Sequence, residues 1–288
     1  AEDCVPRVMS GKTCVVTGAS SGIGKVLALE LARRGARVVM ICRSNDRGRR
    51  AAVQIEQATG EQPYVLLAYL SSQQQIRNVA GEIDKRYERV DVLVNNAGAL
   101  QGRKRRVTED GLEMTFAVNH LAYFLLTNLL REKLEASAPA RIVSTASAAH
   151  GSGKIDFEDL QSERSYSAFR AYANSKLANI QFTRELARRL EGTTVTVNCF
   201  HPGFVGSRFG SGATLPVRVF MLAAKPFITS PTQGADTGLW LACSRDIEGV
   251  SGQYFFKRAF SRSSRAARDD QVAARLWEVS AKLTGLQA

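Results

Sequence analysis

The chain has 288 residues, 44% of them hydrophobic and 23% charged, a composition typical of a soluble globular protein able to bury a sizeable core. No stretch approaches eighteen consecutive apolar residues, so the sequence predicts no transmembrane helix. The net charge of +12 is compatible with a solvated basic surface, which we favour, or with a nucleic-acid or anionic-membrane partner.

Short apolar runs alternate with helical patterns along the chain. The first run, TCVVT at 13–17, ends at glycines, and the helix after it carries Ile23, Leu27 and Leu31 at four-residue spacing. The remaining predicted strands are 36–42, 64–70, 90–96, 141–147, 194–200 and 252–256, and the remaining predicted helices are 46–58, 72–88, 111–137, 169–191 and 269–284.

These strands are apolar throughout instead of alternating with polar residues, which predicts a parallel sheet covered on both faces. No repeat, low-complexity tract or linker interrupts this alternation of predicted strands and helices. We therefore predict an α/β fold in which residues 1–288 form a single Rossmann-type, doubly wound domain with helices on both faces. The ligand crevice is expected at the carboxyl ends of the strands.

A glycine-rich turn, TGASSGIG at 17–24, follows the first predicted strand. Its three glycines permit a tight turn and a close backbone approach to a pyrophosphate at the N-terminus of the next helix. An ordinary glycine-rich turn is the structural alternative. The position between a strand and a helix favours a dinucleotide site.

Further candidate residues follow later strands at the same edge. NNAG at 95–98 has small residues against which a ribose or nicotinamide could lie, and Asn95 is expected to bridge neighbouring strands by hydrogen bonds. An ordinary strand-to-helix turn is the alternative. Ser147 follows the fifth predicted strand, and His201-Pro202-Gly203 follow the sixth.

Tyr172 and Lys176 are four residues apart in a predicted helix and therefore share a face. A phenol ordinarily titrates near pH 10, and a neighbouring cation stabilises its phenolate. The pair by itself is a weak signal, because exposed tyrosines often lie near lysines by chance.

Together, TGASSGIG, NNAG, Asn119, Ser147, Tyr172-x-x-x-Lys176 and PGFVGS resemble the short-chain dehydrogenase/reductase family, over roughly residues 10–256. The stretches at 153–167, 171–190 and 267–286 resemble its retinol dehydrogenase branch. Many members of that branch carry an N-terminal membrane anchor, which we do not expect in this chain.

The resemblance implies roles for four residues. Tyr172 would be the general acid and base, while Lys176 would lower its pKa and hold the nicotinamide ribose. Ser147 would position the substrate oxygen, and Asn119 would anchor a water of the proton relay. The structural alternatives are that Ser147 simply ends a strand, and that Asn119 is a buried helical asparagine whose side chain is hydrogen-bonded to the backbone.

The predicted cofactor-binding residues lie in the motifs named above and at the end of the second strand. They are Gly18, Ser20, Ser21, Gly22, Ile23, Gly24, Arg43, Asn95, Ala97, Gly98, Tyr172, Lys176, Pro202, Gly203, Val205 and Ser207.

The end of the second predicted strand bears on the choice of cofactor. NAD enzymes place an acid there for the ribose 2′-hydroxyl, but this chain has Arg43, which can pair with a 2′-phosphate. We therefore predict NADP(H), with a surface arginine as the alternative. Tyr69 stands where the family usually has an aspartate that accepts the adenine amino group.

Two segments are predicted to lie outside the regular alternation: a substrate loop at about 204–231 and a C-terminal helical extension at about 257–288. The loop could form a lid over a bulky apolar substrate or simply a packed helix. Its apolar stripe is Leu215, Val219, Phe220, Leu222 and Phe227, punctuated by Pro216 and Pro226.

The five cysteines show no C-x-x-C spacing, and the three histidines are not paired at metal-ligand spacing, so we expect reduced thiols and no metal site. The first residues contain no apolar signal-peptide core. We expect a cytoplasmic protein and leave open a peripheral contact with an anionic membrane and assembly into a homo-oligomer. The basic clusters at 102–106 and 257–268 lack an aromatic stacking ladder, so no nucleic-acid partner is expected.

The sequence thus predicts an NADP(H)-dependent oxidoreductase that interconverts a carbonyl and an alcohol. Its expected substrate is bulky and apolar: a retinal-like or long-chain aldehyde, or a ketone. The alternatives are a ketoreductase of steroid or secondary-metabolite type, or a non-catalytic NADP-binding module that docks a partner through its basic C-terminal surface.

Overall fold

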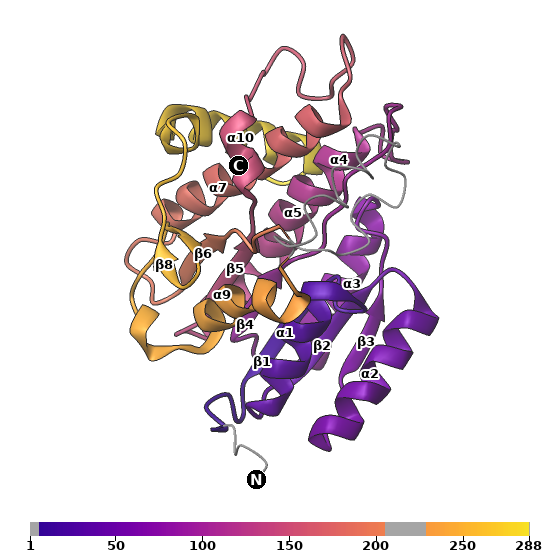
Figure 1. Cartoon of the computed structure of the whole chain (residues 1–288), viewed down its shortest axis with the longest axis vertical. Helices are drawn as coiled ribbons and strands as arrows, with labels where there is room; N and C mark the ends of the chain where they lie inside the picture. The colour runs from indigo at the N-terminus through magenta and orange to yellow at the C-terminus, as the bar shows by residue number, and fades with distance from the viewer. Residues whose placement is uncertain (1–5, 205–228, 288) are drawn as a thin grey trace.

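The computed structural model describes residues 6–204 and 229–287, whose strands form one sheet in the order β3-β2-β1-β4-β5-β6-β7-β8 (Figure 1). Every neighbouring pair is parallel except β7 and β8, which are antiparallel. The strands are β1 Thr13–Thr17, β2 Arg37–Cys42, β3 Tyr64–Leu67, β4 Val92–Asn95, β5 Arg141–Thr145, β6 Thr196–Phe200, β7 Tyr254–Phe256 and β8 Ala259–Phe260. This is the predicted doubly wound α/β fold, because the strand order reverses between β1 and β4.

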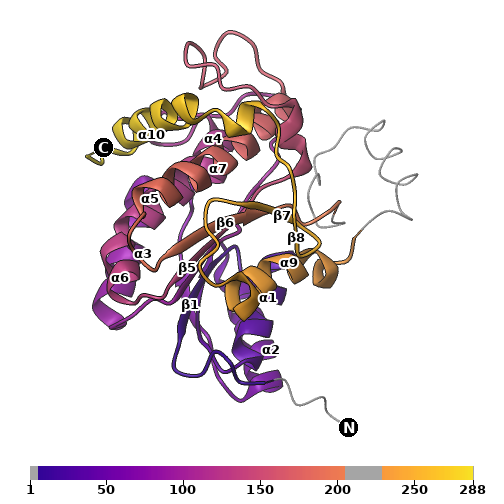
Figure 2. The same cartoon turned by 90° about the vertical axis from the view of Figure 1, so that its left-hand side faces the viewer.

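The helices cover both faces of the sheet. On one face α3, α5, α7 and α10 pack over Val15 and Leu93, and on the other α1, α2 and α9 pack over Cys14 and Val16 (Figure 2). Successive residues of β1 therefore enter opposite cores, which explains why the strand is apolar throughout. The helices are α1 Gly22–Arg33, α2 Asn45–Thr59, α3 Gln73–Arg86, α4 Met114–Phe116, α5 Ala122–Leu129, α6 Arg131–Ala136, α7 Ala168–Arg189, α9 Pro231–Cys243 and α10 Asp270–Thr284.

The helix predicted over 111–137 is instead broken into α4, α5 and α6. A π-helical turn, Ala117–Leu121, lies between α4 and α5, and Leu130 separates α5 from α6. Nearly every residue from 112 to 127 is buried, so the apolar residues there carry no stripe that could reveal a break. The strand predicted over 64–70 likewise ends early, at Leu67.

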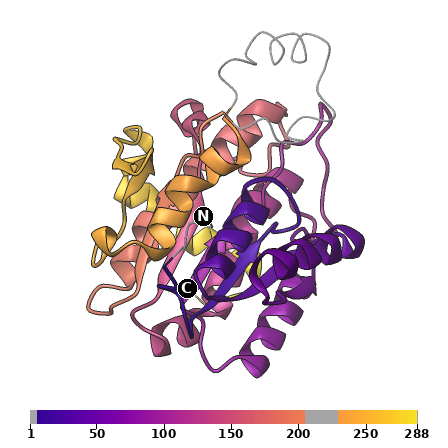
Figure 3. The same cartoon turned by 60° about the horizontal axis from the view of Figure 1, so that its bottom comes forward.

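Helix α9 was missed from the sequence, although its start carries a clear signal. Ser230 accepts a hydrogen bond from the Gln233 backbone at 3.2 Å, the Gln233 side chain accepts one from the Ser230 backbone, and Pro231 is the first helical residue. This is a capping box with proline at the N1 position. The helix lies beside α1 and completes that face of the sheet (Figure 3).

The C-terminal extension is helical only in its second part, α10. Residues 257 and 258 form a two-residue turn between β7 and β8, with φ of 50° at Lys257 and 58° at Arg258. Positive φ at both positions is typical of a type I′ hairpin turn, which normally uses asparagine and glycine. Because this turn consists of lysine and arginine, the sequence pattern did not predict the hairpin.

Among the helices of residues 6–204 and 229–287, none has both the length and the apolar character needed to cross a bilayer.

Candidate active site

The sequence motifs meet at the carboxyl edge of the sheet. Thr17, Asn95 and Thr145 end β1, β4 and β5, and the pairing of these strands places their ends side by side. A doubly wound sheet binds its ligands at this edge.

The glycine-rich turn leaves no room for a Cβ at Gly18 or Gly24 and exposes backbone donors. Gly18 and Gly22 have φ of 68° and 57°, and a Cβ at Gly24 would lie 2.5 Å from the Gly18 carbonyl oxygen. Ser21, the residue before α1, makes no side-chain capping bond to the first turn of that helix. The first N–H groups of α1 are thus available to an anionic ligand.

The turn is tied to the NNAG segment by Thr17 and Asn96, two residues that the sequence analysis did not select. Thr17 Oγ1 accepts hydrogen bonds from the backbone of Asn96 at 2.8 Å and of Ala97 at 3.0 Å. The Asn96 side chain donates to the Thr17 carbonyl at 2.9 Å. A Cβ at Gly18 would lie 2.9 Å from the Ala97 Cα, so the two motifs are in direct contact.

The prediction that the Asn95 side chain bridges neighbouring strands is therefore wrong, because Asn96 makes that connection. Asn95 is fully buried, and its amide donates to Thr127 Oγ1 in α5 at 2.9 Å. The alternating pleat directs neighbouring side chains to opposite sides, and sequence alone does not say which asparagine faces the crevice.

Asn119 lies in the π-helical turn and holds this segment against α7. Its Oδ1 accepts from the Ala99 backbone at 2.8 Å, while its Nδ2 donates to the Ala99 carbonyl and to Ser175 Oγ, both at 3.0 Å. Its backbone carbonyl accepts from Asn179 Nδ2 at 2.9 Å. A π-turn inside an α-helix frequently marks a functional site. The side chain has a structural role here, and the water-anchoring role stays a prediction.

Ser147 and Tyr172 are hydrogen-bonded to each other through their side chains. Ser147 follows β5 and starts a short 3₁₀ turn, where its Oγ accepts from the Ala149 backbone at 3.2 Å. Tyr172 lies in the second turn of α7, half-buried. Ser147 and Tyr172 are 25 positions apart in the chain, and the fold brings their two hydroxyl groups together in the crevice.

Lys176 lies one helical turn after Tyr172 and is only 2% exposed. Its Nζ donates to the Thr145 carbonyl at 2.9 Å and lies 5.7 Å from the centre of the Tyr172 ring. A Cβ at Gly98 would lie 3.5 Å from the same Nζ, so the lysine borders the NNAG segment.

Burial controls the titration of both groups. It lowers the pKa of Lys176 to about 7, and it raises the pKa of Tyr172 although the hydrogen bond with Ser147 opposes that shift. The lowering of the tyrosine pKa by a charged Lys176 stays a prediction.

His150 is a further residue that the sequence analysis did not assign. Its Nδ1 lies 2.7 Å from the Ser147 carbonyl oxygen, and its Nε2 accepts from the Ser264 backbone at 3.1 Å. The first contact requires an N–H on Nδ1 and the second a lone pair on Nε2, which selects one neutral tautomer. His150 thereby connects Ser147 to the C-terminal extension.

A hollow of about 430 Å³ lies beyond the ends of β2 and β3 and is lined by Arg43, Ser44, Arg47, Tyr69 and others. Ser44 is the N-cap of α2, and its Oγ accepts from the Arg47 backbone at 3.4 Å. Two guanidinium groups at one hollow favour an anionic ligand.

The remaining predicted residues divide into two groups. Pro202 and Gly203 follow β6 at the same edge, and the Gly203 N–H donates to His201 Nδ1 at 3.2 Å. Val205, Ser207 and the apolar stripe of the substrate loop lie outside the described residues.

The sequence profile described as short chain dehydrogenase matches residues 12–214. The chain belongs to the short-chain dehydrogenase family. It is 45% identical to retinol dehydrogenase 14 of Mus musculus over 98% of this chain and 88% of that protein. It is 44% identical to retinol dehydrogenase 13 of Homo sapiens over 96% of this chain and 86% of that protein. These relatives confirm the retinol dehydrogenase-like branch of the family.

Solved structures of other proteins share the fold. A protein from Mycobacterium paratuberculosis superposes with a TM-score of 0.79 at 32% identity, covering 99% of this chain and 97% of that one. A short-chain dehydrogenase from Shigella flexneri, solved with NADP, gives a TM-score of 0.66 at 26% identity, over 87% of this chain and 98% of that one. The chain is thus an oxidoreductase that interconverts carbonyl and alcohol groups.

Proposed function

We propose that this short-chain dehydrogenase uses NADP(H) to interconvert a bulky apolar aldehyde or ketone and its alcohol. The observation that carries the proposal is the hydrogen-bonded pair of Ser147 and Tyr172, with the Lys176 ammonium 5.7 Å from the tyrosine ring. Two hydroxyls at one point can bind a carbonyl oxygen together, and one of them can deliver a proton.

The residues present fit a nicotinamide dinucleotide. Gly24 lacks space for a Cβ, and α1 begins with uncapped N–H groups, as a bound pyrophosphate requires. Gly98 and Lys176 border the space into which the ribose and nicotinamide would extend. When bound, the cofactor supplies or accepts the hydride.

The chain's own residues handle the proton and the substrate oxygen. In the reduction, Ser147 donates a hydrogen bond to the carbonyl oxygen, and Tyr172 transfers its phenolic proton to that oxygen as the alcohol forms. Lys176 stabilises the resulting phenolate, which then takes a proton from solvent. Asn119 keeps Ala99 and α7 fixed so that the distances between these groups do not change.

The preference for NADP(H) rests on the hollow at the ends of β2 and β3. Arg43 and Arg47 both line it, and no carboxylate lies among its lining residues within the described part of the chain. A 2′-phosphate would gain charge-assisted hydrogen bonds there, whereas no carboxylate in that lining could accept a hydrogen bond from a 2′-hydroxyl. Tyr69 lines the same hollow and is the candidate contact for the adenine.

The apolar substrate class rests on two exposed aromatic residues and on the relatives. Phe169, 59% exposed, precedes Tyr172 by one helical turn, and Phe204, 48% exposed, follows Gly203. The relatives reported above are named retinol dehydrogenases, enzymes of an apolar alcohol. Exposed aromatic side chains beside a polar centre suit a substrate with a long apolar body.

The proposal is tested by following NADPH oxidation with aldehydes of increasing chain length, retinal and a steroid ketone. We expect KM to fall with chain length, because each buried methylene contributes up to about 0.8 kcal/mol. NADH should be a poorer donor at equal concentration. Absence of turnover with every carbonyl would contradict the catalytic proposal, and a KM independent of chain length would contradict the apolar substrate site.

A further inference from the structure

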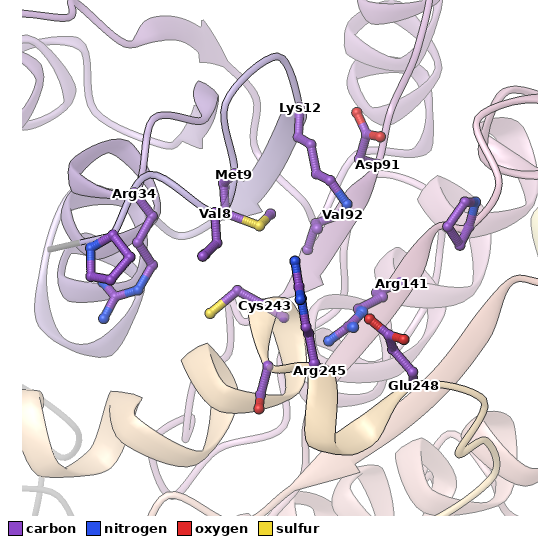
Figure 4. Close-up of a pocket in the computed structure, with 14 residues that line it drawn as sticks. Val8, Met9, Lys12, Arg34, Asp91, Val92, Arg141, Cys243, Arg245 and Glu248 are labelled. Carbon is purple, nitrogen blue, oxygen red and sulfur yellow. The ribbon is translucent and has the colours of Figure 1, made fainter.

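A second hollow lies at the opposite, amino edge of the sheet. It has a volume of about 500 Å³ and lies between the segment before β1, the starts of β4 and β5, and the end of α9 (Figure 4). Strands rise about 3.3 Å per residue, so Arg141 at the start of β5 lies roughly 13 Å from Thr145 at its active-site end. The hollow is therefore separate from the active site.

Three cationic side chains converge on this hollow from different elements. Figure 4 shows Lys12, Arg141 and Arg245 directed into it, from before β1, from β5 and from the turn after α9. Within residues 6–204 and 229–287, none of the three makes an ion pair. Arg141 donates to the Leu241 carbonyl at 3.1 Å, and burial lowers the pKa of its guanidinium. The charge of Glu248 opposes that shift without forming an ion pair with Arg141, and a bound anion would stabilise this half-buried cation further.

The other charged groups around the hollow do not neutralise these cations. Arg34 and Asp91 are already paired, with Glu30 and Arg89 respectively. Glu248 is the one remaining carboxylate among the described lining residues, and it forms no ion pair with any of the three cations. Three cations against one carboxylate leave an excess of two positive charges, which a doubly charged anion would balance.

Most of the remaining lining residues are apolar. Val8, Met9, Val92 and Pro139 line the hollow, and Val8 is 51% exposed. A volume of about 500 Å³ lies within the range of small-molecule sites, about 300–1,000 Å³, and exceeds the needs of a bare phosphate ion. The wall therefore suits a molecule with an anionic head and an organic body.

We propose that this hollow binds a small phosphate ester. Its phosphoryl group, which carries about −1.5 to −2 charges at neutral pH, would lie among Lys12, Arg141 and Arg245. Its organic part would lie against Val8 and Pro139. The proposal does not depend on the reaction proposed above.

Phenyl phosphate is a suitable probe, titrated calorimetrically at constant ionic strength beside inorganic phosphate and phenol. We expect one site for phenyl phosphate, weaker binding of inorganic phosphate and none of phenol. The double variant Lys12→Gln/Arg245→Gln should lose at least about tenfold in affinity, because two charge-assisted contacts disappear. Both side chains reach solvent, so the variant should fold, which its melting curve checks. Lys85→Gln removes an exposed charge that does not line the hollow and should bind like the wild type.

Other results would overturn the proposal. Equal losses in the double variant and in Lys85→Gln would show general attraction to a basic protein. Loss in Arg43→Gln alone would place the probe in the hollow of the carboxyl edge. If vesicles of phosphatidic acid in phosphatidylcholine bound through Lys12 and Arg245 while phenyl phosphate did not, the ligand would be a lipid headgroup and not a soluble ester.

Discussion

The candidate catalytic groups at the carboxyl edge of the sheet and the unpaired cations at its amino edge are held in opposite ways. At the carboxyl edge, the side chains of Thr17, Asn119 and Lys176 are buried, and each is hydrogen-bonded to a backbone group of another element. At the amino edge, Lys12 and Arg245 reach solvent and make no ion pair within the described residues.

This difference indicates two kinds of site. Buried polar groups with fixed partners form a rigid arrangement before any ligand arrives, which chemistry requires because catalytic distances must not vary. Solvated cations without partners can attract an anion but do not fix its orientation. Changes at the carboxyl edge should therefore alter turnover, while exposed charges elsewhere should not.

The most severe change at the carboxyl edge is Tyr172→Phe, which removes only the phenolic hydroxyl. We expect kcat to fall by about 10²–10⁴, the usual contribution of a general acid, with little change in cofactor affinity. Steady-state rates and cofactor titration measure the two effects separately. Lys85→Gln, an exposed change on α3, is the control and should retain wild-type turnover. Near-normal turnover of Tyr172→Phe would remove this tyrosine from the mechanism.

Lys176→Met should lower kcat by about 10² and weaken cofactor binding. Burial lowers the pKa of Lys176 to about 7, so the ammonium is present below that pH and is lost as the pH rises. The ratio of wild-type to variant affinity for NADPH should therefore decrease from pH 6 to pH 8, because the titration of the 2′-phosphate affects both proteins alike. The dual role of the lysine would be refuted by a variant with wild-type affinity and the same pH dependence.

Arg43→Asp tests the cofactor preference independently of the substrate. The variant loses an attractive charge and gains a repulsive one toward a 2′-phosphate, so the preference for NADPH over NADH should fall roughly ten- to a hundredfold. Arg47 lines the same hollow and can partly replace Arg43, so we expect a change nearer to tenfold than to a hundredfold. Quenching of tryptophan fluorescence by both cofactors provides the measurement, with Lys85→Asp as the charge control. An unchanged ratio, or a wild type that prefers NADH, would contradict the assignment.

His150→Phe removes both hydrogen bonds that connect Ser147 to Ser264. We expect kcat to fall about tenfold with KM and cofactor affinity nearly unchanged, because His150 positions Ser147 and does not touch the reacting atoms. Burial lowers the pKa of His150, so the wild type should lose activity only below its ordinary pKa, when Nε2 gains a proton and no longer accepts. His150→Phe should lack that acidic loss. A parallel fall in thermal stability and in cofactor affinity would instead indicate a purely structural residue.

The smallest expected effect concerns His120, buried beneath the catalytic groups. Its Nε2 contacts Ser280 Oγ at 2.9 Å, and burial lowers its pKa to about 4. The unfolded chain therefore binds one more proton between about pH 6.5 and 4, so stability falls as the pH decreases through this range. We expect this residue to account for about 1–2 kcal/mol of the loss in unfolding free energy between pH 7.5 and 5. Urea unfolding of His120→Gln should show a shallower pH dependence, and an identical one would refute the assignment.

Local patterns in the sequence were sufficient for much of the fold. Apolar runs of five to seven residues predicted the strands from β1 to β6, because a strand buried on both faces needs no alternation. The positions of Tyr172 and Lys176 on one helical face followed from the helix period alone. The glycine-rich turn was recognisable because its conformation excludes side chains, and that restriction is visible within eight residues.

What only the tertiary structure decided depends on residues far apart in the chain. The contact of His150 with Ser264, the connection of Thr17 with Asn96 and the convergence of Lys12, Arg141 and Arg245 have no local signature. The π-helical turn at Asn119 lies in a stretch that is buried on nearly all sides, so no apolar stripe marks it. The titration of Lys176 depends on how completely the assembled fold excludes water. Hydrogen-bond partners and desolvation are properties of the packed chain, whereas periodicity and backbone restriction are properties of short segments.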